Sequence, residues 1–421
     1  MTGLRWGGRK EDEIAFRRET MNTSEVVIIG GGRTPMVDYV GVPGGGKFKD
    51  ISAIELGAIA TKAVLEKFKV PFDIIDELIF GYGMQSSPDG GYGARHVALF
   101  AGLPETVPAL TLGRTCGSGF QSIITGAKDI ILSESAFIVA GGMENMSQVP
   151  YVIRGAREGF RMGDRKVEDY LMASLHDSYC NMNMAQTADK LARTYGVTRE
   201  DADQFAYESQ IKATRATEEG KLKEEIIPVK TKIRKETLTV NADDHIRPET
   251  TPEALAEIPP AFGEESLVTG GNASAIVDGA AAVVITSVEK AQAYGFEPLG
   301  RIVSWAIVGV DPSIMGIGAA VAMKKVLEKA GMGLDDIDLF EVNEAFACQY
   351  LAVERELGLD RKKVNVNGGA IALGHPLGMT GTRLTYTLLL ELRRRKQKYG
   401  LASACTGGGQ GVAIITEAFN D

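Results

Sequence analysis

The chain has 421 residues, of which 44% are hydrophobic and 24% charged, and a formal net charge of −9. This length suits two or three domains with sizeable cores, and the acidic balance argues against nucleic acid or an anionic membrane surface as the main partner. Four scattered cysteines without CxxC spacing argue against a disulfide framework and a zinc site, so we expect no bound metal.

Residues 1–22 are interpreted as an N-terminal extension, because the first strand-like run begins only at Val26. The extension mixes arginine and lysine with acidic residues, whereas a secretory signal needs an apolar core and a mitochondrial presequence is poor in acids. No apolar run in the sequence reaches the length of a membrane span. These observations favour a cytoplasmic location and no membrane partner.

Two similar halves follow one another along the chain. The stretches FDIIDELIFGYG (72–83) and LDDIDLFEVNEAF (334–346) both read as a helix end, a turn and a buried strand. The strands SAFIVAGGME (135–144) and LASACTGGGQG (401–411) both end in glycines. The repeat distance is about 260 positions, which indicates a duplication. Alternating strands and helices predict an α/β fold with mainly parallel, covered sheets.

The region from 146 to 275 is more polar than its surroundings and carries charge-rich helical stretches such as residues 198–225, which we interpret as a solvated face. We expect it to be an inserted loop domain. The N-terminal half then comprises residues 23–145 and 276–298, and the C-terminal half comprises residues 299–421.

Cys116 stands directly before a Gly-Ser-Gly turn in RTCGSGFQS. The residues that follow repeat an apolar side chain at helical spacing, which predicts a helix beginning close to Cys116; they are Phe120, Ile123, Ile124, Ala127, Ile130 and Ile131. A helix N-terminus stabilises a thiolate and lowers its pKa. A buried structural cysteine is the competing interpretation.

His375, in GGAIALGHPLGMTG, occupies the position that matches Cys116 in the repeat, and the duplication would place the two opposite each other. A cysteine–histidine pair makes a thiol nucleophilic near neutral pH. Cys405 ends a strand and precedes three glycines, where ligands of α/β folds bind; its thiol suits proton transfer at carbon. Cys180 and Cys348 have no such setting and are assigned to structure.

The other glycine clusters, GGGRTP (30–35) and GGGK (44–47), lack the spacing of a phosphate-binding loop, so ATP is not expected as a ligand.

Four ordered motifs, CGSGFQS, NEAF, GGAIALGHPLG and CTGGGQG, resemble those of the thiolases, and the likeness runs from about residue 25 to the C-terminus. The resemblance implies an acyltransferase of fatty acid metabolism (acetyl-CoA C-acyltransferase or C-acetyltransferase). Such an enzyme cleaves a 3-ketoacyl-CoA with CoA, or runs the reverse Claisen condensation. It implies CoA as co-substrate and no tightly bound cofactor.

The resemblance also implies residue roles. Cys116 would carry the acyl group, His375 would activate it and the incoming CoA thiol, and Cys405 would be the acid/base at the α-carbon of acetyl-CoA. Asn343 would hold a water that forms one oxyanion site with His375. The N–H groups of Cys116 and Gly407 would form the other oxyanion site, where developing charge must be stabilised.

For CoA the family pattern points to Arg247, Thr250 and Ser274, with Met184 and Phe346 lining the pantetheine channel. The family fold is a five-layered α/β/α/β/α core of two duplicated halves plus an inserted loop domain. The stretch 152–171 resembles the segment that joins dimers into tetramers, so we expect a homotetramer, a dimer of dimers.

Several positions depart from the family pattern. The run Ala319, Ala320, Val321 stands where prolines are usual after GIG, Thr380 stands where serine is commoner, and Asn183 stands where some short-chain members carry histidine. Two alternatives remain open: a ketosynthase-like condensing enzyme, and a non-catalytic acyl-CoA-binding subunit. The sequence leaves open the physiological direction and the preferred chain length.

Overall fold

The computed structural model describes residues 25–233 and 236–420, so the interpretation of residues 1–22 lies outside the described residues. The first half of the core contains β1 (Val26–Arg33), β2 (Val37–Asp38), α2 (Ala53–Lys67), β3 (Glu77–Tyr82), α3 (Gly93–Ala101), β4 (Ala109–Leu112), α4 (Ser118–Ile131), β5 (Phe137–Glu144), β12 (Val277–Ser287) and α9 (Val288–Tyr294). The second half contains β13 (Gly300–Gly309), α10 (Gly318–Ala330), β14 (Leu339–Val342), α11 (Ala347–Leu357), α12 (Ala370–Leu373), α13 (Leu377–Arg395), β15 (Tyr399–Thr406) and β16 (Gln410–Ala418).

The segment between β5 and β12 forms small elements around two longer helices. They are β6 (Tyr151–Val152), β7 (Glu168–Asp169), α5 (Tyr170–Ser174), β8 (His176–Asp177), β9 (Met182–Asn183), α6 (Met184–Thr194), α7 (Arg199–Glu218), β10 (Val229–Ile233), β11 (Glu236–Val240) and α8 (Pro252–Ala256).

The main sheet has ten strands, with β14, β15, β16, β13, β1, β12, β5, β3 and β4 as neighbours in that order and β2 paired to β12. The two halves meet where β1 pairs with β13 over two residue pairs. Among the strand pairs in the described residues, only β3 with β4, β3 with β5, and β14 with β15 run parallel. The expectation of mainly parallel sheets is therefore wrong. One reason is that the turn after Thr406 joins β15 directly to β16, and so short a connection can only join antiparallel strands.

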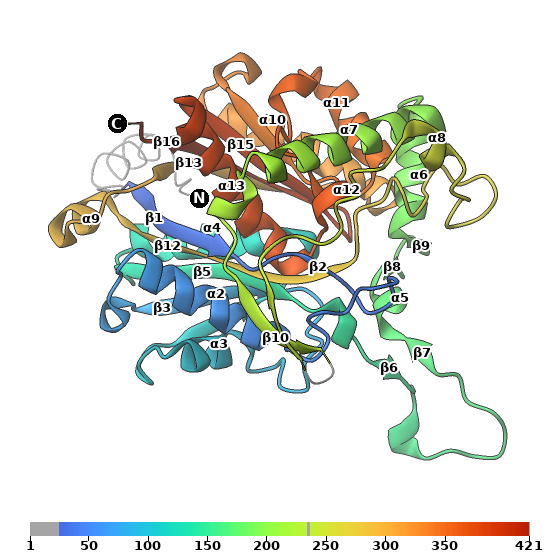
Figure 1. Ribbon diagram of the computed structural model, residues 1–421, viewed down its shortest axis with the longest axis horizontal. Helices are drawn as coiled ribbons and strands as arrows, with labels where there is room; N and C mark the ends of the chain where they lie inside the picture. The colour runs from blue at the N-terminus through green and yellow to red at the C-terminus, as the bar shows by residue number, and fades with distance from the viewer. Residues whose placement is uncertain (1–24, 234–235, 421) are drawn as a thin grey trace, which may run out of the picture.

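The layers follow from the contacts of the helices. Helices α4 and α13 pack on each other, and α13 contacts β5 and β12 of the first half as well as β14 and β15 of the second. On the outer faces, α2 and α3 cover the first half and α10 and α11 the second (Figure 1). One hydrophobic core lies under the outer helices of each half, and a third lies on both sides of the central helices α4 and α13. The expected five-layered α/β/α/β/α fold is confirmed.

The central helices cross at very short range. A Cβ on Gly119 would lie 2.6 Å from the backbone nitrogen of Thr382, and one on Gly381 would lie 2.2 Å from that of Phe120. Only glycine fits at such a crossing, because any larger residue would clash with backbone. The apolar stripe predicted after Cys116 lies on α4, with Phe120 buried towards this middle layer.

The inserted segment lies within the first half in the sequence, but its helices pack against the second half in the structure. Helix α6 contacts α11, and α7 contacts both α11 and α12. The charge-rich stretch predicted as a solvated face therefore has a buried side as well, which includes Phe205 and Ala206. The domain boundaries given above stay a prediction.

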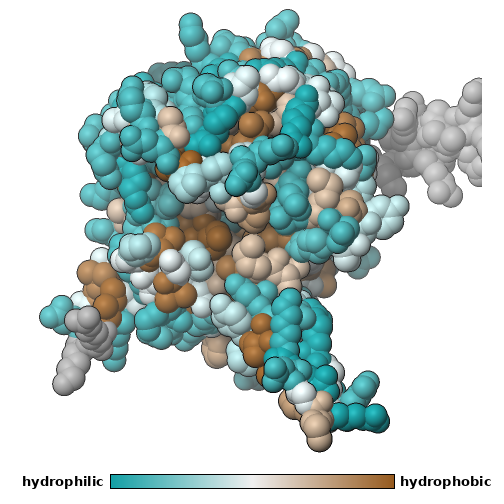
Figure 2. Space-filling view, turned by 90° about the vertical axis from the view of Figure 1, so that its right-hand side faces the viewer, coloured by the Kyte–Doolittle hydropathy of each residue, from teal (hydrophilic) through white to brown (hydrophobic). Residues whose placement is uncertain are grey.

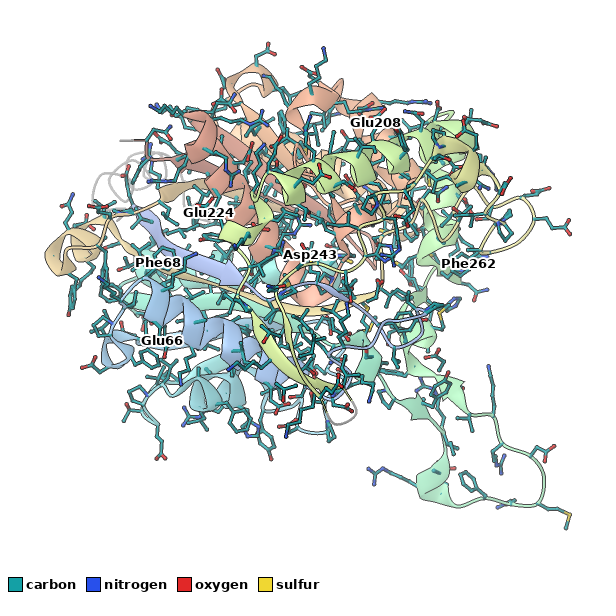
Figure 3. All side chains as sticks on the ribbon, viewed as in Figure 1. Glu66, Phe68, Glu208, Glu224, Asp243 and Phe262 are labelled. Carbon is teal, nitrogen blue, oxygen red and sulfur yellow. The ribbon has the colours of Figure 1, made fainter. Side chains whose placement is uncertain are left out.

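Two buried ion pairs of Arg33 link the inserted segment to the core. The guanidinium of Arg33 donates to both carboxylate oxygens of Asp243, at 2.7 and 2.8 Å, and its Nε donates to Glu225 at 2.7 Å. Asp243 lies near the centre of Figure 3, where the segment crosses the core. No helix in the described part of the chain is long and apolar enough to cross a membrane.

Candidate active site

Cys116 lies in a single 3-10 turn, η2 (Thr115–Gly117), between the end of β4 and the start of α4. Thr115 has a φ of 40°, in the left-handed region that residues other than glycine rarely adopt. Such strained turns concentrate at functional sites. His375 lies in the matching turn of the second half, two residues before α13, as the internal repeat predicts.

Two cavities meet at Cys116. The first, about 170 Å³, is largely apolar and is lined by Cys116 and His375 together with Met184, Ser274 and Phe346, and also by Phe262. The second, about 320 Å³, is lined by Cys116, Gly407, Gly408, Gly83 and Met84 among others. On the face that carries α6, apolar side chains gather around a central hollow (Figure 2), and Phe262 lies beside α6 (Figure 3).

His375 is buried and held by three groups. Its backbone N–H donates to the carbonyl of Ala275 at 3.0 Å. Its Nδ1 lies 2.6 Å from the hydroxyl of Thr380, and that hydroxyl donates to the carbonyl of Pro376 at 3.1 Å. Because the Thr380 hydroxyl proton is thereby engaged, we assign the proton of the imidazole to Nδ1. Nε2 is left as an acceptor, 3.3 Å from the side-chain nitrogen of Asn343.

The environment of the site raises the pKa of Cys116 and lowers the pKa of His375. Burial raises the pKa of the Cys116 thiol to about 11, although hydrogen bonds from the N–H groups of Gly407 and Cys116 act against that shift. Burial, reinforced by the positive charge of Arg383, lowers the pKa of His375 to about 3. Between these values both groups are neutral. The expected lowering of the pKa of Cys116 by the helix terminus is therefore wrong for the free protein, because desolvation of the thiolate outweighs the dipole.

Cys405 lies fully buried near the end of β15. Burial raises the pKa of its thiol, and the proximity of Cys116 raises it further, so the two thiols are neighbours. Gly407 is the first residue after β15, and its N–H donates towards the sulfur of Cys116. The structure therefore brings Cys116, His375, Asn343, Cys405 and Gly407 together.

Of the five residues expected to bind CoA, the structure places Met184, Ser274 and Phe346 in the wall of the first cavity. Arg247 is engaged elsewhere: its guanidinium donates to the carboxylate of Asp38 at 3.0 Å and to the carbonyl of Asp244 at 2.7 Å. Arg247 and Thr250 lie outside the walls of both cavities at Cys116. Their role stays a prediction.

Sequence reasoning missed one buried group at this site, the carboxylate of Glu144. It accepts hydrogen bonds from three backbone N–H groups, and two of them, those of Gly83 and Met84, belong to residues that line the second cavity with Cys116. The signal was present in the sequence, because Glu144 ends the strand SAFIVAGGME and so stands at the edge of the sheet where ligands bind.

Comparison with known proteins decides the family. Residues 26–289 match the model of the thiolase N-terminal domain, and residues 296–418 match that of the thiolase C-terminal domain. The chain belongs to the thiolase family. The expected assignment to this family, and to acyltransferases within it, is confirmed.

Two curated relatives show how close this similarity is. The human mitochondrial 3-ketoacyl-CoA thiolase is 48% identical over 394 residues, covering 93% of this chain and 98% of the relative. An acetyl-CoA acetyltransferase of Pseudomonas aeruginosa is also 48% identical, over 392 residues, with the same coverage. A solved structure of human mitochondrial 3-ketoacyl-CoA thiolase in complex with CoA superposes with a TM-score of 0.90 at 47% identity, covering 94% of this chain and 98% of that one.

The expected cytoplasmic location is contradicted by these relatives. The human protein and four further mammalian relatives, 47–48% identical, are named as mitochondrial. The expectation was based on the composition of the N-terminal stretch, which has neither the apolar core of a secretory signal nor the acid-poor composition of a mitochondrial presequence.

Proposed function

We propose that this thiolase transfers an acyl group between a 3-ketoacyl-CoA and CoA through a thioester on Cys116. It catalyses thiolytic cleavage and, in reverse, the Claisen condensation. The observation that carries the proposal is that Cys116, His375 with an unprotonated Nε2, and the N–H of Gly407 come together where two cavities join. A nucleophile, a base and an oxyanion donor are the parts that acyl transfer needs.

The chemistry follows from the neutral state of the pair. The thiol of Cys116 adds to the 3-keto carbon while its proton passes to Nε2 of His375. The reaction therefore does not require a thiolate in the apolar site before the substrate is attacked. The bond between C2 and C3 then breaks and the acetyl-CoA enolate takes a proton from Cys405. The proton that His375 accepted passes to Cys405, so both groups are neutral again before the second step. In the second step the thiol of CoA gives its proton to His375 and attacks the thioester, and the thiol of Cys116 is restored with that proton.

Two sites would stabilise negative oxygen. The N–H groups of Cys116 and Gly407 already point at the sulfur of Cys116, where the carbonyl of its thioester would lie. On the other side, the side-chain Oδ1 of Asn343 is buried without a hydrogen-bond partner. That unpaired acceptor supports the assignment of a water beside His375, since buried polar atoms are rarely left without a partner.

The two cavities suggest how the substrate lies. We assign the pantetheine arm of CoA to the first cavity, whose apolar wall includes Met184 and Phe346 and a single hydroxyl, that of Ser274. The acyl chain would then occupy the second cavity, beyond Gly407 and Met84. The relatives include both 3-ketoacyl-CoA thiolases and acetyl-CoA acetyltransferases at equal identity, so identity alone does not choose a chain length.

The test is CoA-dependent cleavage of a series of 3-ketoacyl-CoA substrates from four carbons upward. Activity confined to acetoacetyl-CoA would mean a four-carbon enzyme that works in condensation, and activity that persists with longer chains would mean a degradative enzyme. No cleavage of any member by the reduced protein would contradict the proposed function and favour the acyl-CoA-binding alternative.

Thr380→Val should lower kcat about 10- to 100-fold, the usual effect of losing a group that orients a functional histidine. Valine has nearly the shape of threonine but cannot accept the Nδ1 proton of His375, so the imidazole loses its preferred tautomer. Thr380→Ser keeps a hydroxyl and serves as the matched control, with kcat close to that of the wild type. Equal kcat values for the two variants would show that the hydroxyl does not orient His375.

We also propose that the protein is a dimer of dimers. The ribbon formed by β6, β7 and residues 153–167 stands away from the body (Figure 1) and exposes Tyr151, Phe160 and Met162, the last completely. Exposed apolar side chains gathered in this way mark an interaction surface.

Replacing Phe160 and Met162 together by serine should therefore convert tetramers to dimers in light-scattering measurements, with activity per subunit retained. Leu132→Ser changes an apolar side chain that is about as exposed as Phe160 but lies at the end of α4, and should leave the tetramer intact. A wild-type protein that is not tetrameric, or a double variant that still is, would contradict the assignment.

A further inference from the structure

Glu144, the last residue of β5, is a fully buried carboxylate that the steps above do not use. Its Oε1 accepts the N–H of Met84 at 3.1 Å, and its Oε2 accepts the N–H groups of Gly83 at 3.1 Å and of Gly378 at 3.0 Å. Gly83 and Met84 follow β3, whereas Gly378 opens α13. One side chain thus joins both halves of the core.

The start of α13 needs such an acceptor. The first N–H groups of a helix have no partner within the helix and carry its positive dipole end. The residue before α13, Pro376, makes no side-chain capping bond. Glu144, more than two hundred positions earlier in the sequence, supplies a negative charge there. His375 lies two residues before α13, so the position of the base depends on how this helix start is held.

Close contact between the backbones of β5 and α13 places Glu144 beside the start of α13. A Cβ on Gly378 would lie 2.4 Å from the carbonyl oxygen of Met143, and one on Gly142 would lie 1.8 Å from the carbonyl oxygen of Gly378. Helix α13 therefore rests directly on the end of β5. Two of the residues held by the carboxylate, Gly83 and Met84, line the second cavity beside Cys116. The third, Gly378, follows Leu377, which lines both cavities.

The charge of Glu144 also acts on the nucleophile. After burial, that charge is one of the influences that raise the pKa of Cys116. Burial raises the pKa of Glu144 itself to about 7, although its three backbone hydrogen bonds act in the opposite direction. The other titratable groups that interact with it are Asp278 on β12 and Tyr82 on β3. Where the thiol of Cys116 titrates, Glu144 is therefore ionised.

We propose that Glu144 is a positioning residue of this reaction: its carboxylate holds the Gly83–Met84 turn and the start of α13 against Cys116 and so fixes the nucleophile relative to the base. The proposal rests on the proposed function for its effect on turnover. Its effect on the thiol is independent of any substrate.

The test compares Glu144→Gln, Glu144→Asp and a matched control, Glu391→Gln. Glu391 is a buried carboxylate near the C-terminal end of α13, the helix whose start Glu144 contacts. Its hydrogen-bond partners are Asn367, Arg394 and Arg395. Two quantities are measured: kcat and KM for 3-ketoacyl-CoA cleavage, and the pH midpoint of Cys116 alkylation by iodoacetamide, with the modified peptide identified by mass spectrometry.

Glu144→Gln removes the charge and sets an NH₂ group against a backbone donor. We expect kcat to fall about 10- to 100-fold with little change in KM, because small misplacements of reacting groups have effects of this size. The alkylation midpoint should move to lower pH, since a nearby negative charge is lost. Glu144→Asp keeps the charge but has a shorter reach, so it should lower kcat and leave the midpoint in place.

The proposal is overturned if Glu144→Gln lowers kcat no more than Glu391→Gln does, or leaves the alkylation midpoint unchanged. Should Glu144→Gln fail to fold, Glu144→Asp decides alone, and an undiminished kcat in that variant overturns the proposal. If the wild-type protein cleaves no 3-ketoacyl-CoA, the proposed function fails, whereas the alkylation midpoints still decide whether Glu144 acts on Cys116.

Discussion

Cys116→Ala should lower the rate of 3-ketoacyl-CoA cleavage by at least about 10⁴-fold, because loss of a covalent nucleophile leaves only binding and oxyanion stabilisation. The affinity for CoA, measured by calorimetry, should stay close to that of the wild type, since every other residue in the wall of the first cavity is unchanged. The combination of lost turnover and retained binding separates a catalytic cysteine from a structural one.

The matched control is Cys180→Ala, which removes a free, half-buried thiol outside the walls of both cavities at Cys116. It should keep wild-type activity. A Cys116→Ala protein that retains more than a tenth of the wild-type rate would contradict the role of Cys116, and with it the acyl-enzyme.

His375→Ala should lower kcat by about 10²- to 10⁴-fold, the usual contribution of a general base. The reason lies in the thiol: with a pKa of about 11, only about one Cys116 in 10⁴ is ionised at pH 7 in the absence of a base. The residual rate of this variant should therefore rise about tenfold per pH unit up to the pKa of the thiol. Wild-type activity should show no such slope, because its neutral His375 accepts the proton directly.

The pH dependence of Cys116 alkylation in the wild-type protein distinguishes two states of the resting enzyme. If Cys116 and His375 formed a thiolate–imidazolium pair, removal of the histidine would still produce a slope, but the wild-type thiol would already alkylate at full rate near pH 6. A neutral pair predicts slow alkylation there and a steady increase towards pH 11. Alkylation of the wild type that is fast and independent of pH would contradict the neutral pair.

Much of the architecture could be predicted from local sequence. The apolar stripe from Phe120 onwards fixes α4, and the glycine-rich turns at Cys116 and His375 occupy matching places because the two halves are a duplication. The direction of the strands could not be predicted in this way. A buried strand such as β12 has the same apolar sequence whether its neighbours are parallel or antiparallel, and β12 reaches its place only after the long inserted segment.

The electrostatics of the site could not be predicted from neighbours in sequence. The position of Cys116 before α4 indicates a lowered pKa. In the fold, α13 packs against the turn that carries Cys116, and burial of the thiol raises its pKa instead. Glu144 and Gly378 are far apart in the chain, and only the close contact of β5 with α13 brings them together. An arginine such as Arg247 can bind a phosphate, but in the folded chain its guanidinium donates to the carboxylate of Asp38.

The most direct test of this account is to trap the acyl-enzyme. The reduced protein is mixed with acetyl-CoA in the absence of free CoA, quenched in acid, digested and examined by mass spectrometry. We expect one acetyl group on the peptide that contains Cys116, removed on addition of CoA and absent from Cys116→Ala. No acetylated peptide, or an acetyl group on another residue that CoA removes equally well, would contradict the assignment of Cys116 as the nucleophile.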